Sequence, residues 1–176
     1  MVSLDKVKGT LGVGIYLKKI KKIYNLSLKY MFVILSISDS DKHWNKVVEE
    51  YTKRLGKSVK IENIKPSRKG NTTQMIQADT ENVITRLEKF SEYKKVLLSK
   101  EGKQMDTLAL HKNFTDKDCM FVIGWPYGLN ELELSKYIDA KISFGAITLP
   151  HGLAKVTLLE QLYRIGMIAQ GKKYHY

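Results

Sequence analysis

Short apolar runs alternate with longer segments of helical periodicity along most of the chain. Residues 31–38 (MFVILSIS), 95–99 (KVLLS) and 119–123 (CMFVI) are mainly apolar, as expected of strands buried on both faces of a sheet. Two further strands are predicted over 58–64, where apolar and polar residues alternate, and over 142–149 (ISFGAITL). Each of these five runs is bounded by polar, glycine or proline residues, which marks it as a separate element.

Segments with helical spacing of apolar residues separate these strands. They predict helices over 44–55, 72–93, 105–111, 129–137 and 153–170. Strands that alternate with helices indicate an α/β fold with a mostly parallel sheet flanked by helices. Because residues 31–176 contain no internal repeat and no linker, we predict that they form a single domain.

Positive charge is concentrated at the N-terminal end of the chain. The 176 residues carry a net charge of +12, from 30 Lys and Arg against 18 Asp and Glu. Residues 1–30 hold seven lysines and one acid and contribute +6, which leaves +6 for residues 31–176. A chain this basic favours a polyanionic partner, nucleic acid first and an anionic membrane surface second. A lysine-rich surface caused by genome composition would give the same charge, and charge alone does not separate the two.

The basic segment 1–30 is open to three interpretations. A signal peptide fits poorly, because no compact apolar core precedes a small-residue cleavage site. A transit peptide would be basic and nearly free of acids, as this segment is, but the segment has lysines and no arginines. We favour a third interpretation, in which 1–30 is a basic N-terminal extension that is disordered or not native and Met31 is the natural start.

Several kinds of chemistry are disfavoured by the sequence. The single cysteine, Cys119, cannot form an intrachain disulfide, and its place in an apolar strand favours the core over a nucleophilic role. The four histidines lie far apart, so we expect no metal site. No apolar run approaches the roughly 20 residues of a membrane helix. Of the two partner classes that the charge favours, we expect nucleic acid and no membrane.

Three loops that follow predicted strands carry the most informative residues. They are 98–103 (LSKEGK), 124–128 (GWPYG) and 148–152 (TLPHG). Ligands of parallel α/β sheets bind outside the carboxyl ends of the strands, and glycine lets backbone groups approach a ligand closely. Each loop alone has a simpler interpretation as a tight turn, but together they predict a binding site.

Taken together, these segments resemble one protein family. FVIGxxxGL at 121–129, TLPH at 148–151, LxEQLYR at 158–164 and the chain end YHY at 174–176 are similar, in order and spacing, to the bacterial ribosomal RNA large subunit methyltransferase H family. The resemblance covers the chain from Met31, where family members begin. It implies a SPOUT-type α/β fold with a C-terminal trefoil knot, which the periodicity does not predict because knots are rare.

The resemblance also implies an activity. Family members are cytoplasmic homodimers that transfer a methyl group from S-adenosylmethionine to N3 of a pseudouridine in 23S rRNA, on the assembled ribosome. Their site is completed across the dimer interface. By motif, the cofactor positions correspond to Leu98, Gly124, Phe144, Gly145, Ala146, Ile147, Thr148 and Leu149.

The substrate side of the predicted site needs a group that handles a proton, because an N3–H must lose its proton before attack. His151 lies beside the cofactor loop and titrates near neutrality, although it has an equally simple role in capping the following helix. The resemblance adds Arg164 and Tyr174 as catalytic residues. It also implies RNA contacts from Lys155, Lys172, Lys173 and His175. For Arg164 and Lys155, the alternative is an ordinary surface role.

The sequence departs from the family pattern at three positions. Trp125 stands where a second glycine is usual, Lys155 where arginine is common, and Tyr176 where the family ends in Lys or Arg. Trp125 either stacks on a ligand or crowds the pocket. If it crowds the pocket, the alternative is a non-catalytic RNA- or ribosome-binding protein of the same fold. A SPOUT methyltransferase with a tRNA target is the second alternative.

Overall fold

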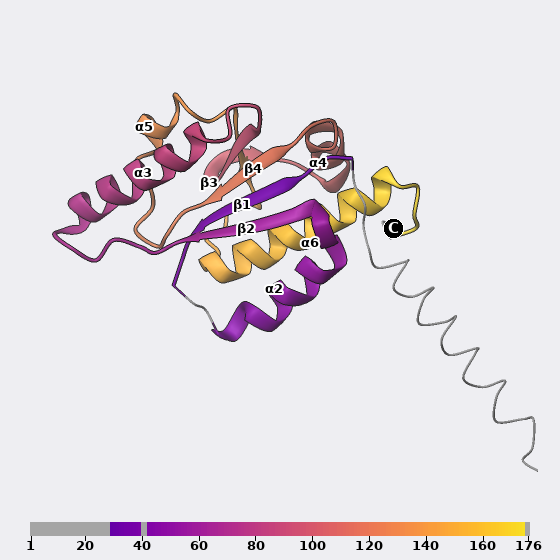
Figure 1. Ribbon diagram of the computed structural model, residues 1–176, viewed down its shortest axis with the longest axis horizontal. Helices are drawn as coiled ribbons and strands as arrows, with labels where there is room; N and C mark the ends of the chain where they lie inside the picture. The colour runs from indigo at the N-terminus through magenta and orange to yellow at the C-terminus, as the bar shows by residue number, and fades with distance from the viewer. Residues whose placement is uncertain (1–28, 40–41, 175–176) are drawn as a thin grey trace, which may run out of the picture.

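The computed structural model describes residues 29–39 and 42–174 (Figure 1). The predictions for segment 1–30 and for His175 therefore fall almost wholly on residues outside this range. The elements in chain order are β1 (Phe32–Ile37), α2 (Lys42–Leu55), a 3-10 turn (Gly56–Ser58), β2 (Val59–Ile64), α3 (Thr72–Glu88), β3 (Lys94–Gln104), α4 (Thr107–Phe114), β4 (Cys119–Ile123), α5 (Glu131–Leu134), β5 (Ala140–Ser143) and α6 (His151–Ala169).

The five strands form one sheet in the order β2-β1-β4-β3-β5, and every ladder between neighbours is parallel. This confirms the predicted α/β fold with a parallel sheet. The carboxyl ends of β1, β2 and β4 lie level, because Ile37 pairs with Ile64 and Ser36 pairs with Ile123. Loops that are distant in the sequence therefore meet at one edge of the sheet.

Helices cover both faces of the sheet (Figure 1). One core cluster joins Leu55 of α2, Phe114 of α4 and Leu159 of α6 to the sheet, and a second joins Val83 of α3 and Leu134 of α5. All six residues of β1 are buried, as the apolar sequence predicted for a strand covered on both sides. Cys119 is also fully buried, and burial raises the pKa of its thiol to about 12, which confirms its place in the core.

A capping box starts α3. The Asn71 side chain accepts the Gln74 N–H at 3.0 Å, and the Gln74 side chain accepts the Asn71 N–H at 2.9 Å. The helix ends at Glu88, five residues before the predicted end, because turn hydrogen bonds from Phe90 to Leu87 and from Tyr93 to Phe90 lead the chain into β3.

The fifth strand is shorter than the sequence predicted. It ends at Ser143 rather than Leu149, because the Ser143 hydroxyl donates to the Gly145 carbonyl at 2.8 Å and accepts the Gly145 N–H at 3.2 Å. Gly145 also has a φ of +130°, which few other residues adopt. Residues 144–150 therefore form a loop, and the prediction that the strand continues to Leu149 is wrong.

The third strand is longer than predicted and approaches β5 twice. Ile142 pairs with Leu98 and, after a register shift, with Lys103. Gly102 lies so close to β5 that a Cβ atom there would be 2.4 Å from the backbone carbonyl carbon of Ile142. The trefoil knot implied by the resemblance stays a prediction. Within the described residues, no helix has the length and apolar character needed to span a membrane.

Candidate functional site

A cavity of about 510 Å³ lies at the carboxyl edge of the sheet, where residues of β3 meet the loops that follow β4 and β5. This volume is in the range of pockets that hold small molecules. Its lining includes Leu98, Ser99, Lys100 and Glu101 of β3, Ile123 at the end of β4 with Gly124, Trp125, Pro126, Gly128 and Leu129 after it, Phe144, Gly145, Ile147, Thr148 and Leu149 after β5, and His151 of α6. The prediction of a loop over 98–103 is wrong, because this segment continues β3 and pairs with β5 again at Lys103. A second hollow of about 630 Å³, between α4 and α6, includes no residue of the loop after β4.

The structure brings the predicted cofactor residues together. Of the eight positions, all except Ala146 line the cavity, and Ala146 is an exposed residue of the same loop. Residues 144–149 lie outside the sheet ladders of the described structure. Their backbone N–H and C=O groups can therefore serve a ligand instead of a neighbouring strand.

Trp125 and His151 lie against each other in the cavity wall. Their ring centroids are 5.1 Å apart, with the ring planes inclined at 41°. The Gly128 N–H donates to the Trp125 carbonyl at 2.7 Å and closes the turn that carries the indole. Trp125 also packs on the core cluster of α3 and α5. The indole thus forms part of the wall, and a cavity large enough for a small molecule remains beside it.

Glu131 is a cavity residue that the sequence analysis did not single out. It is the first residue of α5, and its Oε2 accepts from the Lys141 Nζ at 2.7 Å. Burial opposes ionisation of this carboxyl, but hydrogen bonds from Lys141 and Ser99 and the charge of Lys141 outweigh it and lower its pKa. No motif points to this residue, because its place in the wall follows from the packing of α5 beside β3 and β5.

Arg164 and Tyr174 do not join His151 within one chain. Helix α6 runs from the carboxyl edge of the sheet back toward the opposite edge, near the C-terminal end of the chain (Figure 1). Thirteen residues separate His151 from Arg164 in this helix, a distance of roughly 20 Å along its axis. The three residues predicted to be catalytic therefore lie at two separate places in a single chain. His151 is at the cavity, and Arg164 and Tyr174 are at the other end of α6.

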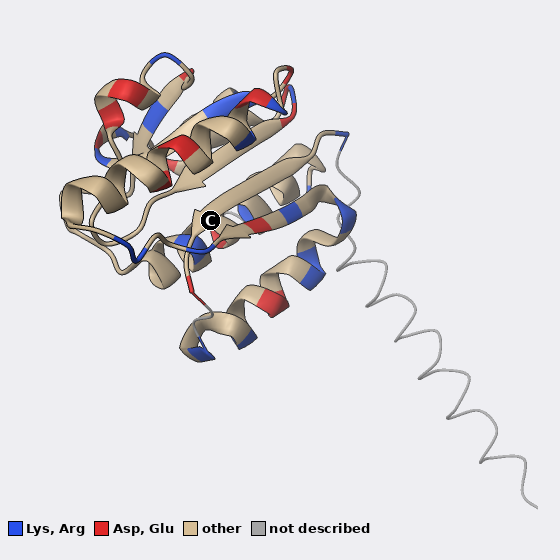
Figure 2. Cartoon of the chain, turned by 60° about the vertical axis from the view of Figure 1, so that its left-hand side comes forward, with Lys and Arg blue, Asp and Glu red and all other residues tan. Residues whose placement is uncertain are grey.

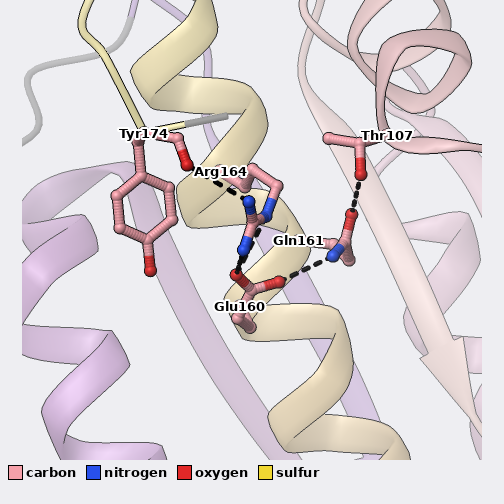
Figure 3. Close-up of polar contacts among 5 residues, drawn as sticks. All are labelled: Thr107, Glu160, Gln161, Arg164 and Tyr174. Atoms are coloured by element: carbon pink, nitrogen blue, oxygen red, sulfur yellow. Dashed lines mark hydrogen bonds and ion pairs between the residues drawn. The ribbon is translucent and has the colours of Figure 1, made fainter. Parts of the chain in front are cut away.

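Arg164 belongs to a connected set of polar contacts, the Arg164 network, which is formed by Thr107, Glu160, Gln161, Arg164 and Tyr174 (Figure 3). The guanidinium donates to Glu160 Oε1 from Nη2 at 2.6 Å and from Nε at 3.0 Å, and to the Tyr174 carbonyl from Nη1 at 3.1 Å. The carboxylate of Glu160 also accepts from Gln161, whose amide oxygen accepts the Thr107 hydroxyl at 2.8 Å. The hydrogen bond to Glu160 raises the pKa of Arg164, so the guanidinium stays charged.

Aromatic rings hold Tyr174 on the same surface. Its ring meets that of Tyr163 edge-on at 4.9 Å, and the Arg164 guanidinium lies 4.9 Å from its centroid. Tyr163 in turn meets Tyr51 of α2 at 6.3 Å, and the Arg54 guanidinium lies 5.3 Å from the Tyr51 ring. The chain is therefore docked on α2 and α6 as far as Tyr174 and is not a free tail there.

The predicted RNA contacts differ in their surroundings. Lys155 is buried, with an exposed fraction of 8%, and its Nζ donates to Ser38 Oγ and Asn63 Oδ1, each at 3.1 Å. Lys172 is half-buried and Lys173 is exposed. A direct contact of any of these lysines with RNA stays a prediction. The Lys155 ammonium is buried and hydrogen-bonded to other residues of the protein.

No group of three or more His, Cys, Asp or Glu side chains among the described residues is placed to hold a metal ion.

Comparisons with known proteins place the chain in a family. Residues 30–175 match the model of a family described as "Predicted SPOUT methyltransferase". Ribosomal RNA large subunit methyltransferase H of Streptococcus suis is 33% identical over 147 residues, which cover 77% of this chain and 92% of that protein. The protein of the same name from Nitrosomonas eutropha is 32% identical over 152 residues, covering 81% of this chain and 96% of that protein.

Solved structures share the fold at lower identity. The structure of ribosomal RNA small subunit methyltransferase E from Neisseria gonorrhoeae, bound to S-adenosyl methionine, matches with a TM-score of 0.51 and 13% identity, over 78% of this chain and 67% of that one. At this identity the likeness shows a common architecture.

Proposed function

Since the chain belongs to the SPOUT methyltransferase family, we propose that it transfers a methyl group from S-adenosylmethionine to ribosomal RNA. The acceptor is N3 of a pseudouridine in 23S rRNA, on the assembled ribosome in the cytoplasm. Residues 31–176 form the catalytic domain. The observation that carries this proposal is the cavity of about 510 Å³, which is lined by seven of the eight cofactor positions expected from the family motifs.

The residues of the cavity fit S-adenosylmethionine. Leu98, Ile123 and Leu129 form apolar parts of the lining, which suit a flat adenine ring, and the loop 144–149 presents backbone groups to its edge. The carboxylate of Glu131 suits the hydroxyls of a ribose or a cationic group. When bound, the cofactor supplies an electrophilic methyl group, so the protein has mainly to position the two reactants.

His151 is the residue we assign to the proton on the N3 atom of the substrate base. It lines the cavity at the first turn of α6, and its ring is held by the neighbouring Trp125. A ring nitrogen of a neutral imidazole can accept a proton from a base placed within hydrogen-bond reach. Replacement by Ala should remove methyl transfer and leave binding of S-adenosylmethionine within about threefold.

A homodimer would unite the two parts of the site. Arg164, which is hydrogen-bonded to the Tyr174 carbonyl and lies against its ring, is roughly 20 Å from His151 along α6. In a twofold dimer, the cavity of one subunit can meet the Arg164 network of the other, and each site is then complete. Arg164 would offer its remaining hydrogen-bonding capacity to the base anion or a phosphate.

The decisive experiment is methyl transfer from labelled S-adenosylmethionine to large ribosomal subunits that lack the modification, with the product located by mass mapping. We expect label on N3 of a pseudouridine in 23S rRNA with the native chain, and none with His151→Ala. Label on tRNA instead would identify the alternative acceptor. Cofactor binding measured by calorimetry without any methyl transfer would contradict the proposal, and no cofactor binding would favour the non-catalytic alternative.

Mixed dimers test whether the site is shared. His151→Ala and Arg164→Ala should each be inactive alone. Mixed after separate purification and subunit exchange, they should recover about a quarter of the native activity, because half of the dimers are mixed and each of these holds one intact site. If the mixture stays inactive while mixed dimers are demonstrated by mass, the two residues act within one chain or not at all.

A further inference from the structure

A basic loop joins β2 to α3 at the same edge of the sheet as the cavity. Residues 65–71 contain three exposed cations, Lys65, Arg68 and Lys69, and no acid. Figure 2 shows basic positions along this connection. None of these three cations belongs to the motifs from which the RNA contacts were predicted.

The loop is held in one shape by contacts within the protein. Pro66 is buried, and the Ser67 N–H donates to Asp79 Oδ1 at 2.8 Å. Asp79 lies on α3 and has an exposed fraction of 3%, so a buried carboxylate anchors the middle of the loop. The capping box at Asn71 anchors its end. Lysines that only keep a protein soluble need no fixed loop. Cations that bind a polyanion of fixed shape do benefit, because a loop that is already ordered loses less conformational entropy on binding.

The loop also lies close to the cavity. The ends of β2, β1 and β4 are level and neighbouring strands are about 4.8 Å apart, so Lys65 follows a strand end roughly 10 Å from the end of β4. Lys155, one helical turn after His151, bonds to Asn63 of β2, two residues before Lys65. The end of β2, from which the loop starts, is thus connected to α6 through one partly buried hydrogen bond.

Arg68 is oriented without being buried. Its guanidinium pairs with Asp39, in the segment after β1, and the two side chains keep exposed fractions of 75% and 42%. Exposed ion pairs of this kind contribute little stability, because water competes for both partners. A phosphate can therefore replace Asp39 at little cost, and Asp39 acts as a weak internal competitor for the same position.

We propose that Lys65, Arg68 and Lys69 form a phosphate-binding surface that holds the RNA backbone beside the cavity. Phosphate contacts position a nucleic acid without reading its sequence, so this surface sets the register of the RNA strand and the cavity selects the base. The inference rests on the proposed function for the identity of the RNA, and it adds residues that the family motifs do not include.

The test compares two double variants that remove the same charge from opposite edges of the sheet. Arg68→Gln with Lys69→Gln changes the loop. Lys112→Gln with Lys117→Gln changes two exposed lysines near the amino end of β4 and serves as the matched control. Binding to large ribosomal subunits is measured by filter retention from 0.05 to about 0.5 M salt. Binding of S-adenosylmethionine is measured in parallel and should be unchanged.

The loop variant should lower the slope of log K against log salt by about 1.4 and weaken binding roughly 25-fold at 0.1 M salt, because each phosphate contact contributes about 0.7 to the slope. The control variant, Lys112→Gln with Lys117→Gln, should leave both the slope and the affinity nearly unchanged. Asp39→Asn should strengthen binding, because it removes the competing carboxylate. Equal losses in the two double variants, or no loss in the loop variant, would overturn the inference.

The result separates this inference from the proposed function. If the proposed function is wrong, the native chain itself transfers no methyl group to large subunits. If only this inference is wrong, the native chain and the loop variant methylate large subunits with the same KM. A loop variant with a raised KM, an unchanged kcat and unchanged cofactor binding would support both.

Discussion

Gly102 offers a sharp test of how β3 and β5 are packed beside the cavity. A Cβ atom at this position would be 2.4 Å from the carbonyl carbon of Ile142 and 2.6 Å from both its nitrogen and its oxygen. Ordinary contacts of a Cβ atom begin near 3.4 Å, so Gly102→Ala requires the two strands to separate by about 1 Å. The neighbouring atoms are all backbone and cannot rotate away, as a flexible side chain would.

The expected loss of stability follows from this geometry. Overpacking costs typically 1–3 kcal/mol, and a clash with three backbone atoms belongs at the upper end, about 3 kcal/mol. For a chain of this size the loss corresponds to a decrease of roughly 6–12 °C in Tm. Because Ile142 directly precedes Ser143, Phe144 and Gly145 in the cavity wall, affinity for S-adenosylmethionine should fall as well.

Urea unfolding and calorimetric cofactor titration check these expectations. Gly171→Ala is the matched control, because Gly171 has a φ of +64° but nothing within 4 Å of its would-be Cβ atom. It should lose about 1 kcal/mol from backbone strain alone and leave cofactor affinity unchanged. The reasoning is refuted if Gly102→Ala is as stable as the native chain, or loses no more than the control.

Three further predictions concern buried or partly buried groups. Cys119, with a thiol pKa of about 12, should resist iodoacetamide at pH 8 until urea unfolds the chain, and rapid alkylation of the native protein, seen by mass, would contradict its burial. Glu131 has a pKa below its ordinary 4.5, so its contribution to stability is present above that value and is lost as the pH falls further; Glu131→Gln should flatten this acid decrease in urea unfolding, and an unchanged pH profile would argue against the Lys141 contact. Lys155→Met keeps the length of the side chain but removes the hydrogen bonds to Ser38 and Asn63, so it should cost about 1.5–3 kcal/mol of unfolding free energy, and a neutral result would show that the ammonium is not held there.

Much of the architecture could be predicted from the sequence. The strand at 119–123 was predicted at its observed bounds, because a strand covered on both faces must be apolar throughout. The fifth strand was extended six residues too far, because apolar residues of a loop that lines a cavity look like residues of a buried strand. Gly145 was the available signal for its end, since glycine permits the turn that closes there.

The sequence by itself determined which segments of the chain line the cavity. Parallel strands place their carboxyl ends at one edge, so the segments that end three apolar runs had to converge there, although 98–103 continues β3 and is not a loop. The family motifs assigned roles to residues in these segments. This inference needs only the type and order of the elements, which local apolar patterns specify.

Only the tertiary structure decided which side chains share a space. The direction of α6 separates Arg164 from His151, although both lie in segments that match the family motifs. The pairing of β1 with β2 surrounds Lys155 with Ser38 and Asn63, so a residue expected at the surface is buried. Glu131 enters the cavity wall through the packing of α5. Local periodicity tells which face of an element is apolar, but the partner across that face depends on contacts between residues far apart in the chain.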